Sequence, residues 1–153
     1  MEISFRPTKE YIVEGEILVI DPHYLLDENV VKVIEDTYYD ENSLLPSSGV
    51  IGIDGKEFFV FPAENGDGNY EVKVYDSVEG EITTDSGAIA FIKKETAVKL
   101  SKDKHVVDAG HLAVLNERDA VKYKGSGKVS GPIVISNGED DIAENWLEDE
   151  DEY

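Results

Sequence analysis

The sequence predicts a mainly β protein: an antiparallel β-sandwich or partly closed barrel with one short helix and an acidic C-terminal tail. Short apolar segments recur at roughly ten-residue spacing with turn residues between them, which favours a sandwich or barrel over α/β architecture. The 153 residues are 41% hydrophobic, enough to form one core. We therefore expect a single β-rich domain over residues 1–138 and an acidic tail over residues 139–153.

The first strand region is predicted over residues 11–20, with the sequence YIVEGEILVI. Its apolar residues indicate either a pair of strands or one strand that bends at Gly15. Pro22 comes soon after and has no N–H to donate to a sheet ladder. The strand is therefore expected to end before this proline.

One short helix is predicted over residues 27–39. Val30, Val31 and Ile34 recur at helical spacing, and Asp27 is suited to the N-cap position. Acidic residues dominate the first turn, where they complement the helix terminus. This is the one helix that we expect within the β-rich domain.

Three further strand regions follow along the chain. Residues 50–53 and 57–61 are expected to form a hairpin, because Asp54-Gly55 between two apolar runs is a strong hairpin signal. Residues 70–75 alternate so that every second side chain shares one face. A last apolar strand is predicted over residues 133–135.

An internal repeat supports the β assignment. Residues 84–98 (TDSGAIAFIKKETAV) align without a gap with residues 107–121 (VDAGHLAVLNERDAV). Each copy predicts an Asp-small-Gly turn, a strand, a charged turn and the start of another strand. Two copies are too few for a solenoid, so we expect them to pair as neighbouring hairpins within one sheet.

Three short motifs occur in order: residues 20–24 (IDPHY), 66–72 (GDGNYEV) and 84–90 (TDSGAIA). With them, the chain resembles a group of small, uncharacterised bacterial and phage proteins that carry a DPCY-like turn, a GDGxYxV strand and a VDSG-type turn. The resemblance spans about residues 17–92, and His23 stands where the group usually has Cys. It implies a compact β fold and no established activity.

The aspartates of these turns are the candidates for a metal site. Carboxylates brought together by the fold would form an oxygen-rich site for a hard divalent cation such as Ca²⁺ or Mg²⁺. The competing interpretation is turn chemistry, in which Asp side chains accept hydrogen bonds from nearby backbone N–H groups; it is the one we favour, and no cofactor is otherwise expected. The candidate metal ligands are Asp21, His23, Asp67, Asp85 and Asp108.

No catalytic residue is assigned, because the chain has no nucleophile-elbow pattern, and an enzyme is the less expected class.

The distribution of charge along the chain is more informative about possible partners. Residues 1–92 hold 20 acids and 5 bases, residues 93–128 hold 5 acids and 9 bases, and residues 129–153 hold 9 acids and no base. A net charge of −20 argues against direct binding of nucleic acid and against an anionic membrane surface.

The acidic tail contains an apolar stripe. Ile142, Trp146 and Leu147 would share one side of a short helix, which suits an anchor for a partner. Two alternatives stay open: the tail docks on its own domain over the basic stretch 93–128, or it is a disordered, solubilising end. The residues expected to bind a partner are Asp140, Asp141, Glu144, Trp146, Leu147, Glu148, Asp149, Glu150, Asp151 and Glu152.

These observations favour a non-enzymatic, cytoplasmic protein that binds a partner with a basic surface. If the chain derives from a phage, as the resemblance allows, it would inhibit a nucleic-acid-handling host protein by imitating phosphate charge. The first alternative is a small metal-binding or hydrolytic module that uses the motif aspartates. The second is a structural or virion component. The sequence leaves the oligomeric state open.

Overall fold

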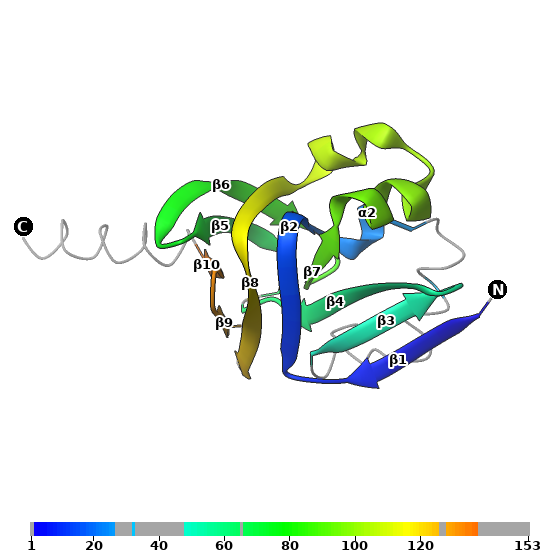
Figure 1. Cartoon of the computed structure of the whole chain (residues 1–153), viewed down its shortest axis with the longest axis horizontal. Helices are drawn as coiled ribbons and strands as arrows, with labels where there is room; N and C mark the ends of the chain where they lie inside the picture. Colours follow the sequence, from blue (N-terminus) through cyan, green and yellow to red (C-terminus); the bar gives the residue numbers. More distant parts are fainter. Residues whose placement is uncertain (1, 27–31, 33–47, 65, 126–127, 138–153) are drawn as a thin grey trace, which may run out of the picture.

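The chain folds into two antiparallel sheets that pack face to face, as the mainly β prediction requires (Figure 1). The computed structural model describes residues 2–26, 32, 48–64, 66–125 and 128–137. In Figure 1 the small sheet lies to the left of the central strand β2, and the helix α2 lies to its right. The sheets do not close into a barrel, so the sandwich alternative of the prediction holds.

The large sheet has seven strands. In spatial order they are β1 (Ile3–Pro7), β3 (Gly49–Ile53), β4 (Lys56–Pro62), β7 (Ala88–Lys93), β2 (Glu10–Ile20), β8 (His111–Gly125) and β9 (Lys128–Ser130). The small sheet has three: β10 (Ile133–Asn137), β5 (Gly68–Val74) and β6 (Ser77–Thr84). Three short helical segments complete the described chain: η1 (Pro22–Tyr24), α2 (Lys94–Ser101) and η2 (Lys104–Ala109).

The strand β2 lies at the centre of the large sheet and is buried on both faces at its C-terminal end. Val19 packs toward the small sheet, whereas Leu18 and Ile20 pack on the opposite side. The strand bends where Gly15 adopts a φ of +71° and the register with β8 shifts. The prediction of one strand that bends at Gly15 and ends before Pro22 is therefore confirmed.

Aromatic side chains fill the space between the two sheets. Phe91 lies 5.3 Å from Phe61 and 6.2 Å from Phe59, measured between ring centroids, and all three are fully buried. Tyr11 stacks on Phe59, and Tyr123 packs beside Phe61. On the other face of the large sheet, a second apolar cluster includes residues from β2, β3, β4, β7 and η2, together with Leu25, which follows η1, and Ala97 of α2.

The predicted hairpin is confirmed. Ile53 pairs with Lys56, and Asp54-Gly55 forms the two-residue turn with positive φ at both positions. Strands also occur where residues 70–75 and 133–135 predicted them. The predicted helix over residues 27–39, Lys32 excepted, and the tail over residues 139–153 lie outside the described residues.

The repeat is only half confirmed. Both Asp-small-Gly segments lead into strands, β7 and β8, but in the second copy Asp108 and Ala109 end the helical segment η2. After β7, however, residues 94–101 form the helix α2 instead of a turn and a strand. The segment KETAVKLS is rich in good helix formers, and Ala97 packs on the large sheet, whereas the matching residues 117–124 continue the strand β8.

The two copies also do not pair with each other, contrary to the prediction. The strand β2 lies between them and pairs antiparallel with both, so that Ile17 faces Lys93 on one side and Ala113 on the other. Both copies supply a strand with apolar residues for the core, and their sequence similarity does not determine which strand becomes the neighbour of each. Within the described chain, no helix combines the length and apolar content that crossing a membrane requires.

Replacing Phe91 by Ala should lower the free energy of unfolding by about 3–5 kcal/mol, because a fully buried ring between two other rings would leave a cavity. Urea unfolding followed by circular dichroism measures this loss. The control is Ile12→Ala, since Ile12 is 43% exposed and its truncation should change stability by less than about 0.5 kcal/mol. Equal losses in the two variants would contradict the described core.

Candidate functional site

Two of the three motifs meet at one corner of the fold, around the carboxylate of Asp21. This side chain is fully buried, at 0% exposure. One carboxylate oxygen, Oδ1, accepts from the backbone N–H of His23 at 3.0 Å and from the hydroxyl of Ser86 at 2.6 Å. The other, Oδ2, accepts from the N–H groups of Asp85 at 2.8 Å and Ser86 at 3.3 Å.

This corner is the place where the chain crosses from the small sheet to the large one. Strand β6 ends at Thr84, the turn follows, and β7 begins at Ala88. The hydroxyl of buried Thr84 donates to the carbonyl of Ala88 at 2.7 Å and closes the turn. Tyr24 adds a link from η1, because its hydroxyl donates to Asp85 at 2.9 Å. The carboxylate of Asp21 thus acts here as a turn cap.

The third motif lies at the same end of the small sheet. Gly68 pairs with Thr84, so the backbone of Asp67, one residue earlier, lies near the Asp85 turn. The hydroxyl of Tyr70 donates to the carbonyl of Gly66 at 2.7 Å and holds this loop. The side chain of Asp67 is exposed.

The fourth candidate aspartate, Asp108 of the second repeat copy, is exposed in η2. Its Oδ2 lies 3.8 Å from Nδ1 of His105, and both side chains face solvent. Of the candidate metal ligands, the fold therefore gathers Asp21, His23 and Asp85 at one corner. No three His, Cys, Asp or Glu side chains of the described ranges form a group that could hold a metal ion.

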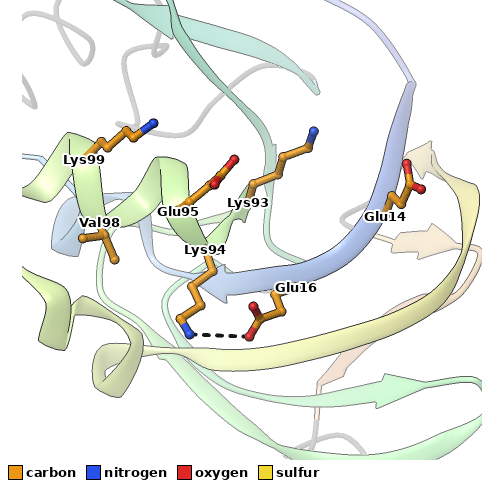
Figure 2. Close-up of a pocket in the computed structure, with 7 residues that line it drawn as sticks. All are labelled: Glu14, Glu16, Lys93, Lys94, Glu95, Val98 and Lys99. Atoms are coloured by element: carbon orange, nitrogen blue, oxygen red, sulfur yellow. Dashed lines mark hydrogen bonds and ion pairs between the residues drawn. The ribbon is translucent and has the colours of Figure 1, made fainter.

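A separate hollow of about 620 Å³ lies beside α2 and was not predicted (Figure 2). Strand β2 and the end of β7 form its other walls, and Figure 2 shows the Nζ of Lys94 directed at Glu16 across it, at 3.5 Å. Three lysines and three glutamates line it, so their formal charges cancel. Its lining residues are Glu14, Glu16, Lys93, Lys94, Glu95, Val98 and Lys99.

A second hollow, of about 520 Å³, lies next to the Asp21 corner between η1, η2 and the end of α2. Apolar side chains such as Leu25 and Leu100 form part of its wall, and Tyr24, Asp103 and His105 supply polar groups. Neither hollow has a nucleophile with a matched base among the hydrogen bonds of the described chain. The walls of each hollow come from segments that lie far apart in the sequence, so the sequence alone did not predict either hollow.

The residues predicted to bind a partner, from Asp140 to Glu152, lie outside the described part of the chain. Their role therefore stays a prediction. Comparison with known protein families, curated proteins and solved structures finds no match for this chain. The resemblance carried by the three motifs stays a prediction as well.

Replacing Asp21 by Asn should lower the free energy of unfolding by about 3 kcal/mol, because an amide nitrogen would face hydrogen-bond donors in a buried site. Chemical denaturation measures the loss. Asp85→Asn is the matched control: Asp85 is exposed and its amide oxygen still accepts from Tyr24, so we expect a loss below about 1 kcal/mol. A loss at Asp21 no larger than that of the control would contradict the turn-cap role.

The hydrogen bond from Tyr24 to Asp85, together with the negative charge of that carboxylate, raises the pKa of the Tyr24 phenol above 10.0. Because the folded-state pKa is raised, the stabilising contribution is present below pH 10 and is lost as pH rises through the raised pKa. Asp85→Asn should therefore lower the pKa of Tyr24. A ¹³C NMR titration of the tyrosine Cζ resonances measures it, with Tyr24→Phe to assign the signal and Asp76→Asn as control. An unchanged Tyr24 titration in Asp85→Asn would refute this.

Proposed function

We propose that this protein is a non-enzymatic, acidic interaction protein that binds a basic surface on a nucleic-acid-handling protein. In its most specific form it is a phage-type inhibitor that occupies the partner's nucleic-acid site by imitating phosphate charge. One observation carries the proposal: 34 acids stand against 14 bases, and residues 139–153 contain nine of these acids and no base. Closely spaced carboxylates attract the Lys and Arg side chains that otherwise bind phosphates.

The distribution of carboxylates within the described chain is consistent with this proposal. Among these residues, Asp21 is the one buried acid, and four hydrogen bonds occupy it in a turn. The remaining acids lie at the surface or partly exposed. On the small sheet, Glu71 and Glu81 stand directly opposite each other on neighbouring strands. Like charges in this position destabilise a sheet, so fold stability does not account for their pairing.

Charge of this size acts at a distance. Opposite potentials steer two proteins together and raise the association rate, and added salt screens the effect. The proposed protein would therefore associate rapidly with a basic cleft at low salt and lose affinity steeply as salt rises. It would compete with nucleic acid for the cleft, while its own charge repels nucleic acid. Among the described residues no metal-ligand group supports the alternative metal-binding function.

The test compares two full-length variants against a panel of purified basic nucleic-acid-binding proteins. In the first variant, Asn and Gln replace the acids of residues 140–152, so the charge is lost and the apolar stripe is kept. In the second, Ser replaces Ile142, Trp146 and Leu147, so the charge is kept. We expect the first variant to bind at least about tenfold more weakly at low salt, and the second to keep its salt dependence.

Binding is measured by displacement of labelled duplex DNA from each panel protein over a range of salt concentrations. Displacement by the unaltered chain that weakens with salt supports the proposal. If no basic protein of the panel binds the unaltered chain at low salt, or if the charge-neutralised variant displaces DNA equally well, the proposal is wrong.

A further inference from the structure

The two sheets approach each other along β6 and β8 without backbone pairing between these strands. Side chains bridge them instead. Nε2 of His111 lies 2.9 Å from Oε1 of Glu79, and the hydroxyl of Tyr75 accepts from the N–H of Asn116 at 2.9 Å. His111 contacts Glu79, whereas the later Asn116 contacts the earlier Tyr75, so β8 and β6 run in opposite directions. We call residues 75–81 and 111–117 the seam.

Exposed apolar side chains gather on this seam. Five large hydrophobic side chains of the described chain are strongly exposed, and three of them belong to the seam: Tyr75 at 44%, Val78 at 56% and Val114 at 56%. Single exposed apolar residues are ordinary on protein surfaces. Here all three lie on two strand segments that the His111–Glu79 and Asn116–Tyr75 contacts bring together, and gathered apolar side chains of this kind mark interaction sites.

At the tip of the β5–β6 hairpin, Tyr75 is held in a backbone conformation that is unfavourable for its side chain. Tyr75 has a φ of +49° and Asp76 a φ of +67°, a region that Gly, Asn and Asp adopt readily and Tyr rarely. The hairpin between β3 and β4 meets the same demand with Asp54-Gly55. Strain of this kind persists only where the surrounding structure holds it in place, and here the Tyr75 hydroxyl is bonded to β8. The Tyr75 hydroxyl is used within the protein, so its partly exposed ring is the part available to a partner.

Acids outnumber bases around the seam. Its two segments contain four acids and neither Lys nor Arg, and one base, Lys73 of β5, stands opposite Val78. Asp76, Glu81 and Glu117 are exposed, and the Glu79 side chain, 40% exposed, is bonded to His111. An apolar centre with a charged border is the usual organisation of a protein–protein interface, where aromatic anchors supply much of the affinity.

We infer that the seam is the surface on which the folded domain docks a basic protein partner. The complementary surface would carry an apolar side chain for the Tyr75, Val78 and Val114 patch, surrounded by Lys or Arg side chains for the four acids. This inference rests on the proposed function: the acidic tail attracts the partner over a distance, and the seam fixes its position. Burial of the patch slows dissociation, whereas charge mainly raises the association rate.

The test uses short synthetic peptides as probes. One alternates Lys with Leu, and the other is an oligolysine of equal charge. We expect the Lys–Leu peptide to bind at least about tenfold more tightly than oligolysine, and to perturb the amide resonances of the seam in ¹⁵N spectra. Fluorescence anisotropy with labelled peptides measures both affinities. Equal affinity of the two peptides would show that the apolar side chains do not contribute to binding, and the inference would be wrong.

Three variants locate the site. Val78→Lys and Val114→Lys place a positive charge on the seam, and Ile12→Lys places the same charge on β2, where Ile12 is 43% exposed. We expect the seam variants to weaken the Lys–Leu peptide at least about tenfold and the control less than about twofold. Tyr75→Asn is a further seam variant, because Asn tolerates positive φ while the ring is lost. Unfolding curves establish that each variant is folded.

The outcomes separate the seam from the tail. If Ile12→Lys weakens binding as much as the seam variants do, only net charge matters and the seam inference is overturned. If neutralising the tail abolishes binding while the seam variants bind normally, the proposed function survives and the seam inference falls. If the seam variants alone weaken binding, the seam inference holds and the role of the tail in the proposed function fails.

Discussion

The arrangement of the two sheets depends on one buried carboxylate. A charged group without water carries a large desolvation penalty, which must be offset by hydrogen bonds. Asp21 receives four of them, and three come from the turn at Asp85 and Ser86. That turn is where the chain passes from the small sheet to the large one, so the same side chain terminates β2 and sets the direction of β7. The aromatic core lies between the two sheets that this corner joins.

Local features of the fold could be predicted because they depend on a few adjacent residues. The Asp54-Gly55 turn, the bend at Gly15 and the strand end before Pro22 each follow from one backbone preference. The helix α2 could not be distinguished from a strand, since the matching segment of the repeat forms part of β8. The order of the strands could not be predicted either. Nothing in the similar sequences of β7 and β8 indicates that β2 lies between them.

The same distinction applies to the site. The sequence placed aspartates at strand ends, and the structure brings Asp21 and Asp85 together in one network. The sequence could not show that hydrogen bonds from a turn occupy both oxygens of the Asp21 carboxylate, because that turn lies in a distant segment. The seam joins strands about thirty-five residues apart, and its apolar residues alternate with polar ones as in any half-buried strand. The one local signal was the unusual Tyr75-Asp76 pair at a hairpin tip.

The central position of β2 has a consequence for biosynthesis. This strand is synthesised before both of its neighbours, β7 and β8, and Glu10 faces Lys122. A nascent chain therefore carries the segment YIVEGEILVI without a full set of neighbours until residues 88–125 have left the ribosome. Long-range pairing of this kind slows folding and exposes apolar surface meanwhile. Glu14 and Glu16 interrupt the segment, and the repulsion among acidic residues keeps unfinished chains apart.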